Sequence, residues 1–364
     1  MRDRTADKLF VLSISLLVLS GIVIFISASL GLLARDGALF GNIVFNQLVF
    51  GLIFGIVACF LTARIPYQFW RRHALFLFAG AIVLNLLLFM PGLGVSHGGA
   101  TRWFSIAGLS FQPSELLKLG FIIYNAAWLS SMKERLQQFR FGILPLFILI
   151  SIVGAILLAQ PDTDTLLVIA AAGLAMFVAS GGRWRDVFVA AVIGAGIISI
   201  VAFTRPYVMD RILTFIDPGR DPLGAGYQIQ QSLIAIGSGQ LTGRGFGQSI
   251  QKFNFLPEPV GDSIFAVAAE EFGFLGTILV LFLFCFFATR GLKIARQAPT
   301  QFSRLLVVGI VILIMVQAFI NMGAMLGLLP ISGIPLPFIS HGGTALLFTL
   351  ASVGIIINIS RFRT

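Results

Sequence analysis

Runs of about 20 predominantly apolar residues follow one another along almost the whole chain, and each is long enough to cross a bilayer core of roughly 30 Å as a helix. Of the 364 residues, 57% are hydrophobic and only 11% are charged. A soluble domain carries far more charge than this, so the pattern excludes that class. The sequence predicts an all-α polytopic membrane protein that forms a single membrane domain over residues 1–364.

The hydropathy pattern predicts ten transmembrane helices. Their expected bounds are residues 9–30, 43–63, 74–90, 114–132, 142–160, 164–181, 186–204, 264–289, 304–326 and 342–360. A much longer connection, residues 205–263, separates the seventh from the eighth. Long connections are usually functional unless they are disordered, and apolar residues at helical spacing predict an amphipathic helix at 227–236. We therefore expect this loop to be ordered.

The charged residues predict the orientation of these helices. If the amino terminus is cytoplasmic, most of the 25 Lys and Arg residues fall in cytoplasmic segments. This positive-inside pattern places both termini in the cytoplasm and accounts for the net charge of +10 without a nucleic-acid partner. Acidic residues are biased the other way, with few inside: Asp3, Asp7, Glu134 and Asp186. Since topology depends little on acids, we expect an extracytoplasmic functional site.

Three carboxylates cluster at the outer mouth of the eighth predicted span. Asp262 directly precedes the span, where an acid is suited both to capping the helix and to chemistry. Glu270 and Glu271 lie about two turns inside the span, and a charge in the membrane is costly unless it is paired or functional. We expect one of them to pair with a cation or the backbone and the other to hydrogen-bond a neighbouring helix.

Cations suited to an anionic ligand occur in two other outer segments. Glu115 and Lys118 are three residues apart on one face of the fourth span, so we expect an ion pair between them. That pair has either a structural role or a role in which Glu115 positions Lys118 for an anionic ligand. Arg102 lies beside Trp103 in an outer loop, and its guanidinium group matches phosphate or carboxylate. A membrane anchor at this position is the alternative.

Other candidate residues favour structural roles. Asp162 and Asp164 in "QPDTDT" are expected to form a turn and to cap a helix. Cys59 and Cys285 lie within spans as packing residues, and no disulfide framework is readable. The three histidines lack metal-ligand spacing, so no metal site is predicted. The sequence also lacks phosphate-loop and dinucleotide motifs in their required context.

Taken together, the outer face holds one well-placed acid, several cations and an amphipathic segment against lipid. This set suits a lipid substrate with an anionic head, because a carboxylate can act as base for a hydroxyl while cations bind phosphate. A pyrophosphate leaving group needs no general acid, since positive charge stabilises it directly. One carboxylate can then suffice for the reaction.

Five motifs carry a resemblance to a known family. They are "RWFSIAGLSFQPSELLKL" (102–119), "QPDTDT" (160–165), "RILTFIDPGRDPLGAGYQIQQSLIAIGSG" (211–239), "GRGFGQSIQKFNFLPEPVGDSIFAVAAEEFGFLG" (243–276) and "NMGAMLGLLPISGIPLPFISHGGTALL" (321–347). With them the chain resembles, over essentially its whole length, the SEDS (shape, elongation, division and sporulation) family, the FtsW/RodA/SpoVE glycosyltransferases of bacteria. "GLSFQPSEL", "RILTFIDP" and "GQSIQKFNFLPEP" look more like the division and sporulation branch than the elongation branch.

The resemblance implies an enzyme that polymerises lipid II into glycan strands at the outer face of the bacterial cytoplasmic membrane. It implies as partners a class B penicillin-binding protein, which is a transpeptidase, and other divisome proteins. The family's required acid falls on Asp262, and its paired Glu and Lys fall on Glu115 and Lys118. A divalent cation, Mg²⁺ or Mn²⁺, bridging Asp262 or Glu258 to pyrophosphate stays open, although the sequence shows no dedicated cage.

On this hypothesis, Asp262 accepts the proton from the 4-hydroxyl of the sugar on incoming lipid II. The oxygen attacks the anomeric carbon of the growing strand, and undecaprenyl pyrophosphate leaves. Four cations are expected to stabilise the departing charge: Arg102, Lys118, Arg211 and Lys252. Two segments are expected to shape the substrate groove: the helix 227–236 with Gln228 and Gln231, and the proline-rich segment 330–341 with Ser340 and His341.

Three positions depart from the family pattern. Gly261-Asp262-Ser263 stands where Thr-Asp-Phe is usual, and Gly261 is expected to loosen the backbone that aims the acid. Asp164 stands where Gly is usual and adds a charge. His341 stands where Tyr is commoner, and it is expected to titrate near physiological pH.

Two rival functions stay open from the residues alone. A flippase for the same lipid-linked precursor predicts charged residues near the membrane midplane and a cavity that opens to both sides. In this chain the few charges within spans lie towards the outer end. A non-catalytic scaffold for the transpeptidase predicts that Asp262 is dispensable, while substitutions at the partner contact abolish function.

Overall fold

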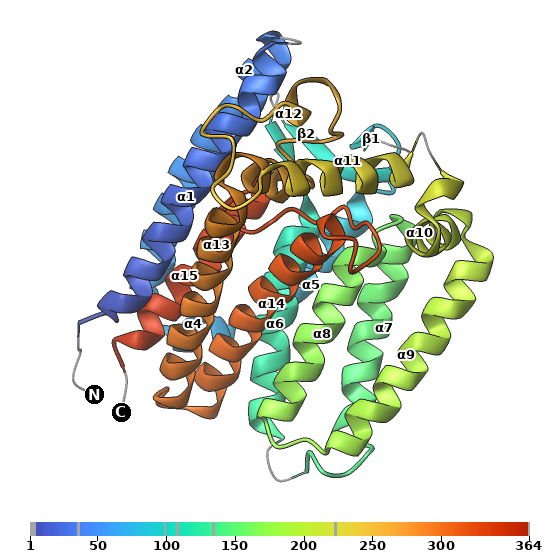
Figure 1. Cartoon of the computed structure of the whole chain (residues 1–364). Coiled ribbons are helices and arrows are strands. Elements are labelled where there is room, and N and C mark those ends of the chain that lie inside the picture. Colours follow the sequence, from blue (N-terminus) through green and yellow to red (C-terminus); the bar gives the residue numbers. More distant parts are fainter. Residues whose placement is uncertain are drawn as a thin grey trace.

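The computed structural model describes residues 5–34, 37–97, 100–106, 109–132, 135–221 and 224–362. Within these ranges the chain is mainly helical, and the helices run side by side in a bundle (Figure 1). Six helical segments are long and apolar enough to cross a membrane. They are α1 (Lys8–Leu33), the continuous segment Gly37–Arg64, α9 (Trp184–Thr204), α13 (Ile264–Arg296), α14 (Gln301–Met325) and α15 (Gly343–Ser360).

Shorter helices complete the bundle. Three are apolar: α5 (Ala74–Leu87), α7 (Ile143–Ala159) and α8 (Thr163–Ala179). The segment Gly37–Arg64 consists of α2 (Gly37–Phe45), the π-helix η1 (Asn46–Ile53) and α3 (Phe54–Arg64). The others are α4 (Tyr67–Arg72) and α6 (Pro113–Ser131). Each of the ten predicted spans coincides with one of these helical segments, so the helix positions are confirmed.

The described part of the connection 205–263 is largely helical. It contains α10 (Pro206–Ile216), the 3-10 turn η2 (Pro218–Arg220), α11 (Ala225–Ser238) and α12 (Gln251–Asn254). Helix α11 includes the amphipathic helix expected at 227–236. These helices lie at one end of the bundle, and both chain termini lie at the other end (Figure 1).

The prediction of an all-α fold is wrong in the loop 91–113, which forms a small antiparallel sheet. Its strands are β1 (Gly94–His97), β2 (Ala100–Ile106) and β3 (Leu109–Phe111), in the order β1-β2-β3. The reason lies in local composition: β2 contains the β-branched Thr101 and the aromatic Trp103 and Phe104, which favour strands. The sheet lies at the same end of the bundle as α11 (Figure 1).

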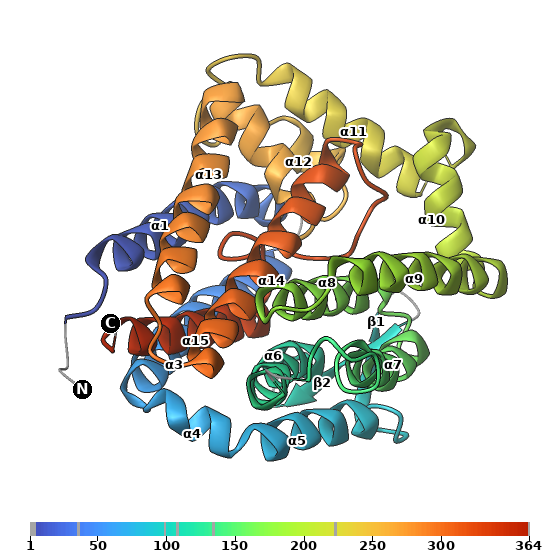
Figure 2. The ribbon, with the colours of Figure 1, turned by 90° about the horizontal axis from the view of Figure 1, so that it is seen from below.

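The bundle has a buried centre and an exposed rim. Helix α14 lies in the middle when the bundle is viewed along its axis, with α13 on one side and α8 on the other (Figure 2). In the most apolar 18-residue stretch of α14, 78% of the residues are buried, whereas only 11% are buried in the corresponding stretch of α9. Large apolar side chains such as Phe188 and Phe203 therefore project outwards from α9. Such a helix is stable only where lipid covers it.

Helix α13 is kinked at Gly273, and the kink anchors the loop that precedes the helix. Gly273 has φ of 64°, which disfavours a side chain. Its α-carbon packs so closely on Gly243 that an added methyl group would clash with the Gly243 nitrogen. The carbonyls of Glu270 and Glu271 instead accept hydrogen bonds from the amides of Arg244 (3.0 Å) and Gly245 (3.0 Å). The loop after α11 is thereby attached directly to α13.

Candidate active site

Asp262 lies at the mouth of α13 with a free carboxylate. The residue that begins the helix as N-cap is Ser263, so the capping role considered for Asp262 is not observed. Among the residues that the structure describes, none donates a hydrogen bond to this carboxylate or forms an ion pair with it. The side chain is half-buried, so it is sheltered while remaining open to a ligand.

The backbone around Asp262 is held from two sides. Asn321 of α14 donates a hydrogen bond from Nδ2 to the Asp262 carbonyl (2.9 Å) and another to the Ile334 carbonyl (2.9 Å). Ser340 donates from Oγ to the Gly261 carbonyl (2.8 Å). The expected looseness at Gly261 is therefore opposed by a direct hydrogen bond from the segment 330–341.

Three charged side chains from different elements meet at Gly333. Arg211 of α10 places Nη1 2.7 Å from Oδ2 of Asp164, which is in the first turn of α8. The same Asp164 oxygen accepts a hydrogen bond from the Gly333 amide (3.1 Å). A methyl group added to Gly333 would lie 3.8 Å from an Asp262 oxygen and 4.0 Å from both Arg211 Nη2 and Asp164 Oδ2. Two acids and one arginine thus surround a single residue.

The electrostatics of this arrangement favour a proton on Asp262. Burial of the carboxyl group, and then the negative charges of Glu258 and Asp164, raise the pKa of Asp262 from 3.8 to about 7. Arg211 and Arg102 oppose the shift without cancelling it. A general base works best when its pKa lies near the working pH. Asp262 therefore has both the exposure and the proton affinity that a base requires.

Arg102 supports the turn before α8. From strand β2 it donates hydrogen bonds to the carbonyls of Gln160 (3.1 Å) and Pro161, and it lies 3.8 Å from Asp162. Asp162 in turn accepts the Thr165 amide (3.4 Å), which confirms the expected helix cap. Binding of a phosphate by Arg102 stays a prediction, and it would compete with these carbonyl contacts.

Glu115 and Lys118 form the ion pair predicted from their spacing. The Lys118 ammonium lies 2.8 Å from a Glu115 carboxylate oxygen, and both side chains are buried. Gln317 of α14 accepts a further hydrogen bond from Lys118 (3.2 Å). The pairing is confirmed, and it joins α6 to α14. Use of Lys118 for an anionic ligand remains a prediction.

Comparison with known proteins identifies the family. The family model of the FtsW/RodA/SpoVE cell cycle proteins matches residues 7–364. The chain belongs to the FtsW/RodA/SpoVE family. A probable peptidoglycan glycosyltransferase FtsW from Geobacter sp. (strain M18) is 37% identical over 97% of this chain and 96% of its own. Stage V sporulation protein E from Bacillus subtilis (strain 168) is 37% identical over 99% of this chain and 98% of its own.

Solved structures agree with the sequence relationship. A chain from a peptidoglycan synthase complex that coordinates polymerization and crosslinking superposes with a TM-score of 0.80 at 27% identity, covering 98% of each chain. The rod shape determining protein RodA of Thermus thermophilus superposes with a TM-score of 0.72 at 26% identity, covering 98% of this chain and 97% of its own. This FtsW/RodA/SpoVE protein is therefore a polytopic membrane protein with a RodA-like fold, and the resemblance inferred from its motifs is confirmed.

In this FtsW/RodA/SpoVE protein, Lys252 is placed away from Asp262. Its side chain is fully buried, with Nζ 2.6 Å from Glu271 and 3.0 Å from the Ser27 hydroxyl of α1. Glu271 lies two turns inside α13. The structure therefore does not bring Lys252 to the acid, and contact between Lys252 and a departing pyrophosphate would require this ion pair to open.

The prediction for the paired acids of α13 is confirmed. Glu271 accepts hydrogen bonds from Ser27 of the neighbouring helix α1 as well as from Lys252. Glu270 accepts the Ser249 hydroxyl (2.5 Å) and the Ile250 amide (3.0 Å). It also lies 3.5 Å from Arg244. We call Glu270, Glu271 and Lys252 the buried charge cluster. Its hydrogen bonds connect the segment 244–252 to α1 and α13.

The remaining predicted site residues lie around the start of α13. Gln228 of α11 donates a hydrogen bond to the Ser263 hydroxyl (3.0 Å), and Gln231 is half-buried one turn further along that helix. The His341 amide donates to the Val260 carbonyl (2.7 Å). Burial lowers the pKa of the His341 ring to about 4, so the expectation that it titrates near physiological pH is wrong. Direct substrate contact by these residues stays a prediction.

The described residues contain no group of three or more His, Cys, Asp or Glu side chains placed to hold a metal ion. Asp262 and Glu258 are therefore not part of a ready-made cage. Of the acids near Asp262, Asp164 is already paired with Arg211. A divalent cation at this site would have to take most of its ligands from the substrate and water.

Sequence reasoning missed the roles of Asp164, Gln317 and Asn321. Asp164 appeared only as an extra charge in a turn, because its partners Arg211 and Gly333 are distant in the sequence. Gln317 and Asn321 are four residues apart, on one face of an apolar helix. Buried amides in a membrane helix usually bond to another element, and this signal was available in the sequence.

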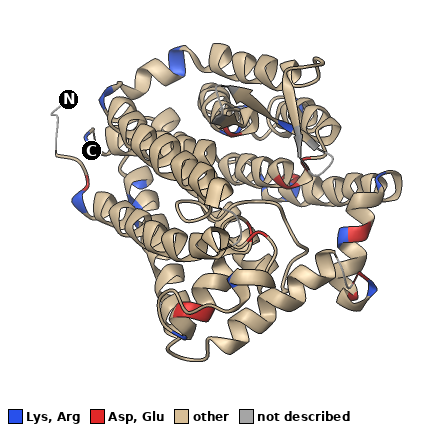
Figure 3. Ribbon diagram, turned by 90° about the horizontal axis from the view of Figure 1, so that it is seen from above, with Lys and Arg blue, Asp and Glu red and all other residues tan. Residues whose placement is uncertain are grey.

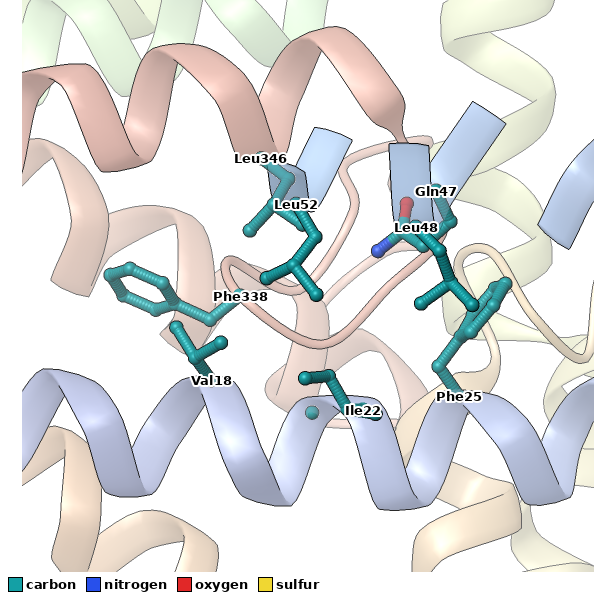
Figure 4. A pocket seen from close by; sticks show the side chains of 9 residues that line it. Val18, Ile22, Phe25, Gln47, Leu48, Leu52, Phe338 and Leu346 are labelled. Atoms are coloured by element: carbon teal, nitrogen blue, oxygen red, sulfur yellow. The ribbon is translucent and has the colours of Figure 1, made fainter. Parts of the chain in front are cut away.

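Two cavities lie elsewhere in the fold. A small one between α1, η1 and the start of α15 holds about 10 Å³ and is mostly apolar (Figure 4). Gln47 in its lining bonds to the Ser340 carbonyl and the Gly342 amide, so it braces the segment 330–341. An apolar groove of about 660 Å³ lies between α11, α13 and α14. Neither lining includes Asp262.

Proposed function

We propose that this chain is a peptidoglycan glycosyltransferase that polymerises lipid II into glycan strands at the outer face of the bacterial cytoplasmic membrane, for cell division. The observation that carries the proposal is the carboxylate of Asp262, which has no ion-pair partner among the described residues, has a pKa of about 7 and lies near Arg211 at the start of a membrane helix. The names of its FtsW and sporulation relatives support this assignment.

The proposed topology has ten transmembrane helices, cytoplasmic termini and the connection 205–263 outside. Support comes from the positive-inside distribution of Lys and Arg. It also comes from the arrangement of the bundle, since α11 and the sheet lie at the end opposite to both termini (Figure 1). Viewed from the end that carries α11, most of the ribbon is uncharged, and acidic and basic segments meet in a few places (Figure 3). The candidate site belongs to this outer end.

In the proposed reaction, Asp262 accepts the proton of the sugar 4-hydroxyl of one lipid II molecule. The oxygen then bonds to the anomeric carbon of the growing strand as the bond to undecaprenyl pyrophosphate breaks. Arg211 lies beside Gly333 with Asp262 and would stabilise the pyrophosphate. Lys118, positioned by Glu115, supplies a second cation for the phosphate groups.

The proposed partner is a class B penicillin-binding protein, which would cross-link the strand as a transpeptidase, together with other divisome proteins. The similarity to a chain of a peptidoglycan synthase complex supports this proposal. Loss of glycan polymerisation on removal of the partner would show that the chain depends on it. Full activity of the purified chain alone would restrict the partner to cross-linking.

Polymerisation of labelled lipid II by the purified protein, with and without its partner, tests the function. Wild type should form glycan strands, and Asp262→Asn should not. Asp210→Asn is the matched control, because Asp210 is an exposed acid on α10. Equal polymer from Asp262→Asn and wild type would contradict the assignment of the base. No polymer from wild type, even with the partner, would contradict the function.

A further inference from the structure

Asp164 is the residue near the candidate base that neither the motifs nor the proposed reaction explains. It lies in the first turn of α8 and is almost fully buried. A buried carboxylate is costly unless donors surround it. Here one oxygen receives both the Arg211 guanidinium (2.7 Å) and the Gly333 amide (3.1 Å). The side chain thus joins α8, α10 and the segment 330–341 around Asp262.

We propose that Asp164 is a positioning residue for the transfer reaction. It holds Arg211 and Gly333 in place and, by engaging Arg211, leaves Asp262 without an ion-pair partner, so that Asp262 can accept a proton. The inference deepens the proposed function and rests on it. Asp164 itself does not touch the reacting atoms.

The geometry supports a competition between the two acids for one cation. Arg211 has an Nη1 contact with Asp164, while its Nη2 lies on the side of Gly333 that also faces Asp262. The structure records an ion pair of Arg211 with Asp164 and none with Asp262 among the described residues. If Asp164 lost its charge, Arg211 would be free to turn its guanidinium towards Asp262. A base paired in this way holds a proton less tightly.

Among the described residues, four charged groups act on Asp262 from the elements packed around it. Glu258 belongs to its own segment, Asp164 to α8, Arg211 to α10 and Arg102 to β2. Arg102 is occupied by the carbonyls of the turn before α8. Removal of the Asp164 charge therefore removes one of two nearby negative charges and leaves both cations. The surroundings of Asp262 become more positive, which lowers its pKa.

The test is the pH profile of glycan polymerisation, measured with the full chain and its partner. In Asp164→Asn the acidic limb of kcat should move to lower pH by at least about one unit, since an arginine beside a carboxylate commonly lowers the pKa by this much or more. The maximal kcat should fall by about tenfold because the base is weaker, while KM changes little. Asp164→Glu should restore the wild-type profile, and Asp210→Asn should leave it unmoved.

A second variant guards against poor folding of the first. Arg211→Gln removes the shared cation, so the acidic limb should move to higher pH, opposite to the shift in Asp164→Asn. A loss of packing alone would not produce shifts of opposite sign. An acidic limb that stays in place in both variants would overturn the inference while leaving the proposed function intact.

An infrared titration separates the two proposals if wild type makes no polymer. The protonated carboxyl band that disappears in Asp262→Asn is followed with pH in wild type and in Asp164→Asn. A band that titrates near neutral pH in wild type and at lower pH in Asp164→Asn supports the role of Asp164. Titration at the same pH in both proteins overturns it, whatever the activity.

Discussion

Two groups of charges flank the first turns of α13, and the fold surrounds them in opposite ways. In the buried charge cluster, Glu270 and Glu271 accept hydrogen bonds from several donors, and Lys252 is enclosed with them. At the mouth of the same helix, Asp262 has no hydrogen-bond donor or ion-pair partner among the described residues. Satisfied charges stabilise a connection, whereas an unsatisfied acid with a raised pKa marks a site for chemistry. Acidic side chains thus serve different purposes at the start of one helix.

The largest expected effect comes from Asp262. Asp262→Asn should reduce the rate of glycan polymerisation at least about 100-fold, because the proton acceptor is lost. The thermal unfolding temperature should not fall, since the asparagine leaves no buried charge behind. A coupled fall in stability and activity would show that Asp262 is structural and would remove the contrast with the buried charge cluster.

The second effect concerns stability in the buried charge cluster. Lys252→Met should destabilise the protein by about 3–5 kcal/mol, because the buried carboxylate of Glu271 loses its ammonium partner. Thermal unfolding in detergent measures this change. Adding Glu271→Gln should recover part of the loss, since it removes the uncompensated charge. Unchanged stability in Lys252→Met would mean that the cluster does not brace α13.

The pH dependence of stability distinguishes the two groups further. Asp262 has a pKa of about 7 in the folded protein, above its ordinary value of 3.8. Its contribution to stability is therefore complete below about pH 4 and is lost as pH rises towards 7, because the folded state binds the proton more tightly. Asp262→Asn should gain stability over wild type across this window. Parallel unfolding temperatures for the two proteins would contradict the raised pKa.

The smallest expected effect concerns the hydrogen bonds that hold the backbone of Asp262. Asn321→Ala removes hydrogen bonds to the carbonyls of Asp262 and Ile334, at about 1 kcal/mol each. We expect a modest fall in unfolding temperature and a fall in kcat, because the backbone that aims Asp262 loosens. Asn358→Ala is a matched control, since Asn358 also bonds to a carbonyl, that of Ala63, in another part of the bundle. Equal effects of both variants on kcat would argue against a role for Asn321 in aiming the acid.

Local features of the fold and the site were readable from the sequence. The helix positions followed from apolar runs, and the Glu115–Lys118 pair followed from a three-residue spacing on one helix. The small sheet at 94–111 was not predicted, because the prediction for this chain relied mainly on hydropathy. Local β propensity in β2 was the weaker signal.

The sequence by itself determined a polytopic helical membrane protein, the family, and Asp262 as the acid to test. Each of these depends on composition, on periodicity or on residues close together in the chain. The tertiary structure alone decided that Arg211 pairs with Asp164, that Lys252 pairs with Glu271, and that Asp262 has no such partner in the described part of the chain. These partners belong to different helices, and a charged side chain bonds to whichever group the packing brings within reach. Helix packing therefore decided which of these charges are satisfied and which are not.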